Sequence, residues 1–384
     1  MKLSNKTHWV PIIVTVITIA LLGLGLLAGR YMVIRPFKKQ IRSHYRCETL
    51  GGFLSDKRKK RAALAYYDSD KVAEEMDNFS WAVPNVPTPF VGNAPKPGKH
   101  NNASINSMQL RVENEVLIPK PSNVYRIFMT GGSTAYGSGA PDQQRTIAGY
   151  LEKILNEKLN SSTNKRYEVL TAANPAWAST HERIMIENRL SELEPDMVIS
   201  FSGNNDVHWG YKGRNILWFR AYADDFFLDL INRAYKISGY GNLVDVPETE
   251  PLPADPSLVA ARIVKNVTLS SYVLSLKKAK YFFFLQPTLA VSKKGLTDNE
   301  RRLLDDKKEK DQKEKAYFLR CYASMNSRLK DLKIDNFRFV NLSDMFDDMG
   351  EKEHIFLDSY HFGDKGNELA ARNIFRQIKP VIYH

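Results

Sequence analysis

Three polar turns of the sequence carry side chains that could act together in catalysis. Ser133 follows two glycines, Asn205 lies in a second polar turn, and Asp358 precedes His361 by three residues. A serine hydroxyl is a weak nucleophile at neutral pH and needs a base within about 2.6–3.2 Å. His361 could take that proton, and Asp358 could hold the imidazole in the required tautomer. These residue types indicate attack by a serine on an acyl group.

Attack on an acyl group also requires hydrogen-bond donors for the oxyanion of the tetrahedral intermediate. The backbone N–H groups of Ser133 and Ala176 and the side-chain amide of Asn205 could supply three such donors. Ala176 belongs to a further turn, Asn-Pro-Ala-Trp, that lies between the serine and asparagine turns. We predict three residues beside these groups as supporting residues: Gly132, Gly203 and Asp206.

The elements around these turns indicate an α/β fold. Short apolar runs bounded by turn residues predict strands at 125–129, 168–172, 197–201, 281–285 and 337–342. Helical patterns lie at 147–159, 180–193, 258–277, 298–332 and 365–378. Strands that alternate with helices favour a parallel sheet covered on both faces, and runs such as MVISF and YFFFL are apolar on both faces. We therefore predict a three-layer αβα, doubly wound, parallel five-stranded sheet. The polar turns follow its strands, so they share one rim.

The order of these motifs resembles the SGNH (GDSL-type) hydrolase superfamily, over about residues 105–384. The motifs are Gly-Gly-Ser133, the turn around Ala176, Gly203-x-Asn205-Asp206 and Asp358-x-x-His361. The resemblance implies a flavodoxin-like sheet of order 2-1-3-4-5, which places Ser133 and Asn205 side by side. It also implies ester hydrolysis without a metal or organic cofactor, and a bacterial membrane-anchored member of the superfamily.

The sequence departs from the pattern of the superfamily in two places. The nucleophile motif is Gly-Gly-Ser-Thr instead of Gly-Asp-Ser-Leu, and Ala176 stands where glycine is usual. Because the donor at this position is a main-chain N–H, alanine can serve if its dihedral angles allow it. A required positive φ would make alanine costly.

Residues 9–29 are almost wholly apolar and, at 1.5 Å rise per residue, long enough to span a bilayer. The run is longer than that of a signal peptide and ends in a poor cleavage site, which favours an uncleaved anchor over residues 9–34. The basic residues that follow it favour a cytoplasmic domain. Short N-terminal anchors before one large domain commonly export that domain instead. We expect an extracytoplasmic catalytic domain in a single-pass membrane protein, with the cytoplasmic alternative left open.

The net charge and the cysteine count limit the kinds of partner and scaffold that are expected. The 55 Lys+Arg and 43 Asp+Glu residues give a net charge of +12, much of it within the first sixty residues. This cluster fits a juxtamembrane segment attracted to anionic lipid and equally fits a solvated basic stretch. Without zinc-finger spacing or an aromatic-basic signature, nucleic acid is not an expected partner. With two cysteines, Cys47 and Cys321, the chain cannot be a disulfide scaffold, although these two could form one bridge.

The predicted organisation is a stub (1–8), an anchor (9–34), a basic juxtamembrane segment with a proline-rich linker (35–104) and the hydrolase domain (105–384). Within the domain, an aromatic-rich insertion (207–279) either buries its rings against the sheet or contacts sugars or acyl chains. Its rings are Trp209, Tyr211, Trp218, Phe219, Tyr222, Phe226, Phe227, Tyr235 and Tyr240.

The predicted function is a membrane-anchored serine hydrolase that removes O-acyl groups, acetyl by preference, from an envelope carbohydrate or a lipid ester. Two alternatives use the same sequence features. One is an O-acyltransferase that moves the acyl group from Ser133 onto a sugar hydroxyl, and the other is a non-catalytic, membrane-anchored binding module. The oligomeric state is left open.

Overall fold

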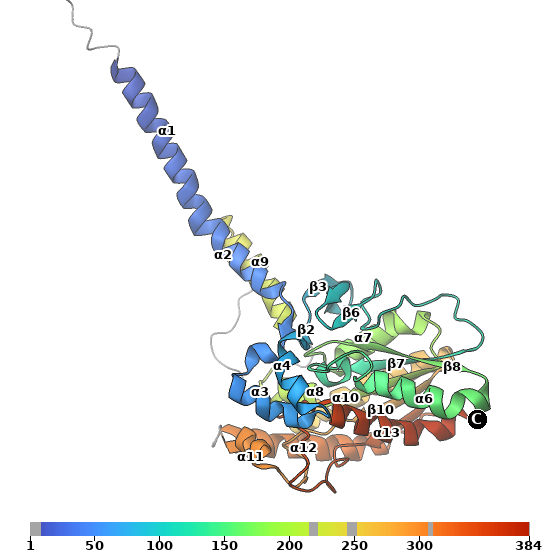
Figure 1. Cartoon of the computed structure of the whole chain (residues 1–384). Coiled ribbons are helices and arrows are strands. Elements are labelled where there is room, and N and C mark those ends of the chain that lie inside the picture. The colour runs from blue at the N-terminus through green and yellow to red at the C-terminus, as the bar shows by residue number, and fades with distance from the viewer. Residues whose placement is uncertain (1–8, 215–221, 244–251, 306–309, 384) are drawn as a thin grey trace, which may run out of the picture. The chain divides into compact units, whose positions relative to one another are not determined.

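The computed structural model describes residues 9–214, 222–243, 252–305 and 310–383 (Figure 1). Contacts divide the chain into two units, Met1–Arg46 and Cys47–His384. The predicted stub at 1–8 lies outside the described residues.

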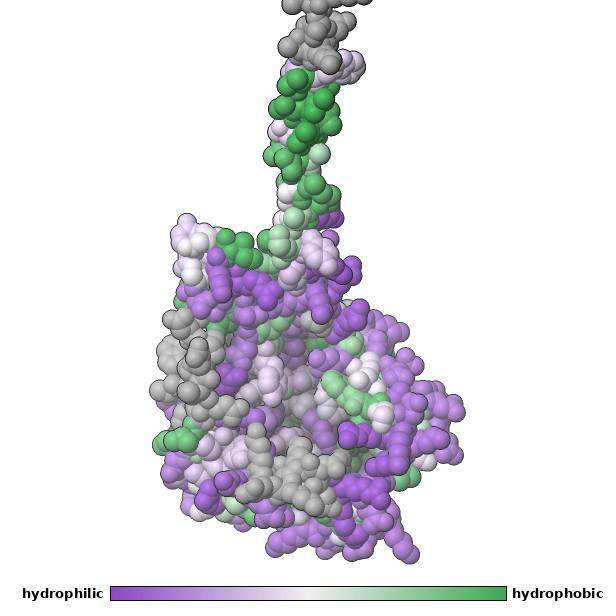
Figure 2. Space-filling model, turned by 90° about the vertical axis from the view of Figure 1, so that its left-hand side faces the viewer, coloured by the Kyte–Doolittle hydropathy of each residue, from purple (hydrophilic) through white to green (hydrophobic). Residues whose placement is uncertain are grey.

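The first unit is helical from Trp9 onward. It contains α1 (Trp9–Gly29), a π-helical turn (Arg30–Ile34) and α2 (Arg35–His44). The stretch Trp9–Arg42 is long and apolar enough to cross a membrane, and Figure 2 shows apolar side chains along its viewed side. Inside it, the hydroxyl groups of Thr15 and Thr18 donate to carbonyl groups four residues earlier, so these polar groups need no water. Its length and composition fit a single membrane span, and a signal sequence meets the same criteria.

The second unit is built on a five-stranded parallel sheet. Its strands are β7 (Val124–Gly131), β8 (Arg166–Ala173), β9 (Met197–Ser202), β10 (Lys280–Leu285) and β11 (Phe337–Asn341). The order across the sheet is β8-β7-β9-β10-β11. In chain order this is 2-1-3-4-5, so both the predicted α/β class and the expected strand order are confirmed.

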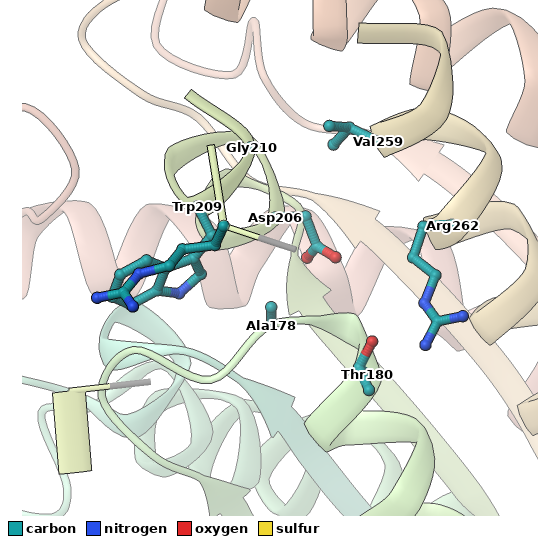
Figure 3. A pocket seen from close by; sticks show the side chains of 8 residues that line it. Ala178, Thr180, Asp206, Trp209, Gly210, Val259 and Arg262 are labelled. Atoms are coloured by element: carbon teal, nitrogen blue, oxygen red, sulfur yellow. The ribbon is translucent and has the colours of Figure 1, made fainter. Parts of the chain in front are cut away.

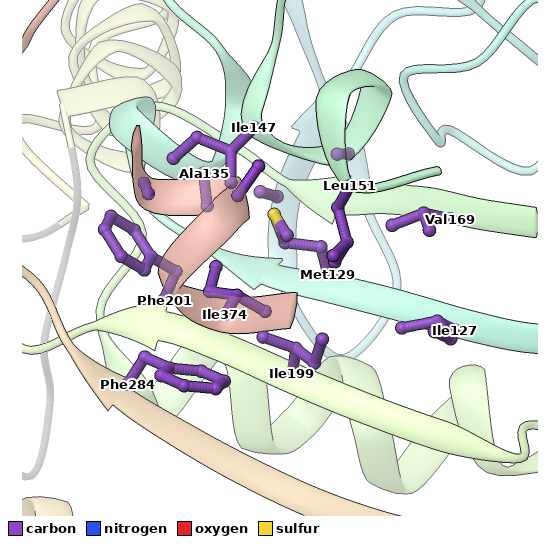
Figure 4. Close-up of a cluster of buried hydrophobic side chains, with 14 of the residues drawn as sticks. Ile127, Met129, Ala135, Ile147, Leu151, Val169, Ile199, Phe201, Phe284 and Ile374 are labelled. Carbon is purple, nitrogen blue, oxygen red and sulfur yellow. The ribbon is translucent and has the colours of Figure 1, made fainter. Parts of the chain in front are cut away.

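Helices cover both faces of this sheet. Alternate residues of one strand enter opposite cores. Ile127 and Met129 pack with the helices α6 (Ile147–Thr163) and α13 (Asp364–Ile382), whereas Phe128 packs with α7 (Ser179–Asn188), α10 (Pro256–Leu276) and α12 (Lys310–Lys330). Figure 4 shows the first core, in which Leu151 of α6 and Ile374 of α13 lie over the strands. The continuous apolar strands are thus explained by burial on both faces.

The helices predicted at 147–159, 180–193, 258–277 and 365–378 are present in the second unit, together with others that the sequence did not predict. They are α3 (Asp56–Ala62), α4 (Ser69–Glu75), α5 (Ser133–Tyr136), α6 (Ile147–Thr163), α7 (Ser179–Asn188), α8 (Asn204–Tyr211), α9 (Tyr222–Ile237), α10 (Pro256–Leu276), α11 (Asp298–Asp305), α12 (Lys310–Lys330) and α13 (Asp364–Ile382). The single helix predicted over 298–332 is described as α11 and α12, with residues 306–309 between them outside the described part.

Residues 47–104 differ from the predicted linker, because they form part of the second unit. Besides α3 and α4 they contain β1 (Glu48–Thr49), β2 (Ser80–Ala82), β3 (Asn85–Thr88), β4 (Gly92–Pro95), β5 (Gly98–His100) and β6 (Ala103–Ile105). These strands form three antiparallel pairs, β1 with β2, β3 with β4 and β5 with β6. Two-stranded pairs tolerate Pro87 and Pro95, since proline is accepted on edge strands. The segment also has an apolar core of its own, which includes Leu50, Tyr66 and Phe79.

The rings of the aromatic insertion differ in burial, which leaves both expected roles open. Trp209 is buried, whereas Tyr222 and Tyr240 are exposed, at 60% and 80%. Trp218 and Phe219 lie outside the described residues. Cys47 and Cys321 are both free thiols, so the possible bridge between them is absent.

Candidate active site

The turn that carries Ser133 begins where β7 ends, and its two glycines allow a close approach of the neighbouring strand. Gly131 has a φ of +148°, and a Cβ on it would lie 2.4 Å from the carbonyl oxygen of Phe201 in β9. A Cβ on Gly132 would lie 2.2 Å from Asn205 Nδ2. A side chain at Gly131 would therefore push β7 away from β9, whereas a side chain at Gly132 would displace the Asn205 amide.

Ser133, His361 and Asp358 form one hydrogen-bonded chain. The Ser133 hydroxyl lies 2.6 Å from His361 Nε2 and can donate to it. On the other side of the ring, Nδ1 lies 2.9 Å from Oδ1 and 2.8 Å from Oδ2 of Asp358. This arrangement assigns the proton of the neutral imidazole to Nδ1 and leaves Nε2 as the acceptor, as a general base requires.

The environment of Asp358 favours its charged form. Desolvation opposes the charge, but the pKa of Asp358 is nevertheless lowered by the charge and hydrogen bond of His361. The backbone N–H groups of Tyr360 and His361 also donate to Oδ1, each at 2.8 Å. Asp358 is therefore an anion at neutral pH and can stabilise an imidazolium at His361.

The three predicted oxyanion donors have different surroundings. Among the described residues, the backbone N–H groups of Ser133 and Ala176 donate no hydrogen bond to the protein. Asn205 Nδ2 donates to the carbonyl oxygen of Trp177 at 2.6 Å, which turns its nitrogen toward the serine turn and leaves its second hydrogen available. The arrangement is compatible with an oxyanion hole, and the roles of these donors stay predictions.

Gly203 and Asp206, two of the predicted supporting residues, contact residues other than the nucleophile. Gly203 has a φ of +109°, and a Cβ there would lie 2.6 Å from Leu285. Asp206 accepts hydrogen bonds from the backbone N–H and the hydroxyl of Ser179, at 3.0 and 2.5 Å. Asp206 thus holds the start of α7, which directly follows the Ala176 turn.

A small cavity beside Asp206 is not a substrate pocket. Figure 3 shows Asp206, Trp209 and Arg262 around it, and its free volume is about 20 Å³. That volume holds one water molecule and neither an acyl group nor a sugar. Trp209 contributes to the site in another way, because its indole N–H donates to the carbonyl of Ala176 at 3.1 Å.

Comparisons with known proteins were made at the level of sequence and of structure. No protein-family model and no curated protein matches the chain. Among solved structures, the acetyl xylan esterase AlAXEase is 16% identical, with 66% of this chain and 99% of the esterase aligned and a TM-score of 0.38. The lipase/acylhydrolase from Enterococcus faecalis is 15% identical over 67% of this chain and 96% of its own, also at 0.38. A two-domain esterase (CEX) active on acetylated mannans is 13% identical over 67% and 49%, again at 0.38.

The TM-scores of these alignments are below 0.5, so the fold is described by its own strand order and motif placement. Ser133 follows the first strand of a 2-1-3-4-5 sheet, Asn205 the third, and Asp358 and His361 the fifth. This strand order and these positions are those that the resemblance to the SGNH hydrolases implies. In this fold the switch in strand order lies between β7 and β9, where ligands of doubly wound sheets bind.

Sequence reasoning missed a buried carboxylate beneath this candidate site. Glu182 of α7 accepts a hydrogen bond from Thr130 at 2.9 Å and another from the hydroxyl of Ser202. Thr130 lies three residues before the nucleophile and Ser202 three residues before Asn205, so Glu182 links the ends of the two strands that carry them. In the sequence Glu182 is one polar residue within a helical pattern, and nothing there distinguishes it.

We expect this carboxyl to make stability depend on pH. Burial raises the pKa of Glu182 to about 7 from its ordinary 4.5. The folded state therefore keeps a proton that the unfolded chain has lost, and stability falls as pH rises from about 4.5 to 7. A shift of that size corresponds to about 3 kcal/mol in the free energy of unfolding. The Glu182→Gln variant should match the parent at pH 5 and exceed its stability at pH 8, by denaturant unfolding.

The control is Glu187→Gln on the same helix, whose carboxylate pairs with Arg183 near the surface at 3.0 Å. It should not reproduce the growing difference between pH 5 and pH 8. A Glu182→Gln effect of equal size at every pH would contradict the assignment of the proton.

Ala176 has the positive φ that the sequence comparison identified as costly, at +68°. A non-glycine residue in this region costs about 1–2 kcal/mol, whereas glycine loses about 0.5–1 kcal/mol through its flexible unfolded state. We expect Ala176→Gly to raise the free energy of unfolding by about 0.5–1 kcal/mol and to leave kcat within about threefold. Ala178→Gly is the control: with a φ of −116° it relieves no strain and should be less stable than the parent. A loss of stability in Ala176→Gly would show that the alanine methyl matters more than the backbone.

Proposed function

We propose that the chain is a serine ester hydrolase of the SGNH superfamily, tethered to a membrane by α1, that removes O-acyl groups from an envelope carbohydrate. The observation that carries the proposal is the 2.6 Å contact between Ser133 Oγ and His361 Nε2, continued to Asp358. Three residues from two distant parts of the chain meet there, in the order and protonation that nucleophilic catalysis requires.

In the first half-reaction, Ser133 Oγ attacks the ester carbonyl carbon while its proton passes to His361 Nε2. The carbonyl oxygen becomes an oxyanion, for which the N–H groups of Ser133 and Ala176 and the amide of Asn205 are the available donors. The intermediate collapses, the bond to the leaving oxygen breaks, and His361 returns the proton to that oxygen. An acyl group is left on Ser133, and the alcohol is released.

In the second half-reaction, His361 takes a proton from water as its oxygen attacks the acyl carbon. Collapse of this second intermediate breaks the bond to Ser133 Oγ, which recovers the proton from His361. The products are a carboxylic acid and the free enzyme. Throughout both steps Asp358 stabilises the positive ring of His361.

The choice of a carbohydrate ester over a lipid ester depends on the tether. A membrane helix confines the catalytic unit near the cell envelope, where acylated glycans are concentrated. The proposal also puts that unit on the extracytoplasmic side. Protease treatment tests this placement: digestion of residues 47–384 in intact spheroplasts supports it, and digestion only in inverted vesicles contradicts it.

The central experiment uses the full chain in detergent. It should hydrolyse p-nitrophenyl acetate, and a fluorophosphonate should add to Ser133 as one covalent group seen by peptide mass spectrometry. Release of acetate from an acetylated glycan then tests the substrate class. A parent protein with no turnover and no label at Ser133 would overturn the proposal.

A further inference from the structure

The segment before the predicted hydrolase domain lies directly on the loop that carries Asp358 and His361. Leu357, which precedes Asp358, belongs to the apolar core that residues 50–79 build. A Cβ on Gly363, two residues after His361, would lie 2.3 Å from the carbonyl oxygen of Ala65. The backbone N–H of Tyr67 also donates to Asp364 at 3.1 Å. The acid–base loop is therefore held from both ends by residues 47–104.

From the same segment, Trp81 contacts the catalytic histidine itself. Its ring centroid lies 4.3 Å from that of His361, with the two planes at 60°. The side-chain hydrogen bonds of His361 use its two ring nitrogens, and the indole packs against the same ring. His361 is 8% exposed. Trp81 thus restricts rotation of the imidazole away from Ser133 and covers it from water.

Trp81 is itself fixed to the nucleophile turn. Its carbonyl oxygen accepts a hydrogen bond from the Ser138 hydroxyl, and the backbone N–H of Ser138 donates to the carbonyl of Ser133 at 3.0 Å. One residue further on, Gly139 donates to the carbonyl of Ser80 at 3.0 Å. The strand β2 is therefore attached to the loop that continues the nucleophile helix, and Trp81 links the nucleophile to the base.

We propose that Trp81 is a positioning residue that holds His361 in line with Ser133. This inference rests on the proposed function, since it concerns the proton that Ser133 gives up. Positioning of the base acts on the proton transfer from Ser133, so it lowers the barrier without changing the affinity for the substrate.

The test compares Trp81→Ala and Trp81→Phe in the full chain. We expect Trp81→Ala to lower kcat for p-nitrophenyl acetate by about tenfold or more, with KM within about threefold, because a loosely held base is rarely in line with the hydroxyl. The rate of fluorophosphonate addition to Ser133 should fall by the same factor. Trp81→Phe keeps an aromatic ring and should recover most of the lost rate.

Phe53→Ala is the matched control. The Phe53 ring packs against Trp81, with centroids 6.1 Å apart, and is 56% exposed. Its removal trims the same aromatic cluster without touching His361, and kcat should stay within about twofold. Thermal unfolding of all variants separates a loss of folded protein from a loss of rate per folded molecule.

Each contrary outcome has a distinct meaning. Labelling of the parent with an unchanged rate in Trp81→Ala overturns the role of Trp81 and leaves the proposed function intact. A rise in KM at constant kcat also overturns the positioning role of Trp81. So does a Trp81→Phe variant whose kcat is as low as that of Trp81→Ala. A parent chain that neither labels nor turns over overturns both proposals.

Discussion

In the Ser133→Ala variant we expect kcat for p-nitrophenyl acetate to fall by about 10⁴-fold or more and fluorophosphonate labelling to disappear. Without Oγ there is no atom to receive the acyl group, and His361 has no proton to accept from it. Removal of one member of such a triad leaves only the contribution of the oxyanion donors and binding. The measurement is initial rate and label incorporation in the same preparation.

The fold should survive this change, since the Ser133 side chain is half-buried and its one hydrogen bond in the described structure is to His361. Unfolding curves that coincide with those of the parent would establish this. Ser275→Ala, at an exposed serine on α10, is the matched control and should keep full activity. Activity in Ser133→Ala within tenfold of the parent would mean that another group is the nucleophile.

The sheet could be predicted from the sequence because its strands are short, continuous apolar runs bounded by turn residues. Runs such as residues 281–285 are apolar on both faces, and the structure buries alternate residues in two different cores. Short apolar runs between turn residues therefore located β7 to β11 to within two residues at each end. Periodicity alone did not supply the strand order, which came from the motifs that resemble the SGNH superfamily.

The convergence of Ser133, Asp358 and His361 could be predicted for a related reason. In a parallel sheet all the carboxyl ends share one edge, so polar residues in the following turns converge even when they are far apart in the chain. The structure does bring Ser133 and His361 within hydrogen-bond distance across 228 positions. Ala176 was recognised as a departure, but only the backbone reveals its φ of +68°.

The packing of residues 47–104 against the candidate site could not be predicted from the sequence. The proline-rich stretch lacks helical or strand periodicity, and Trp81 meets His361 across 280 positions of sequence with no motif to mark the contact. Similarly, Glu182 lies in a helical pattern whose buried side only the tertiary structure defines. Both residues act through contacts with distant elements, which local pattern does not encode.

Loss of the base should be almost as severe as loss of the nucleophile. We expect His361→Ala to lower kcat by about 10³-fold or more with the fold retained, because water is a poor substitute for an imidazole held 2.6 Å from the hydroxyl. The truncation leaves a space bounded by Ser133, Asp358 and Trp81. Added imidazole should enter it and restore part of the rate in a concentration-dependent manner, with no such effect on Ser133→Ala.

His100→Ala, on the hairpin strand β5, is the control and should behave as the parent. A loss smaller than tenfold in His361→Ala would show that a different group accepts the proton, and the absence of imidazole rescue would show that the space between nucleophile and carboxylate had collapsed.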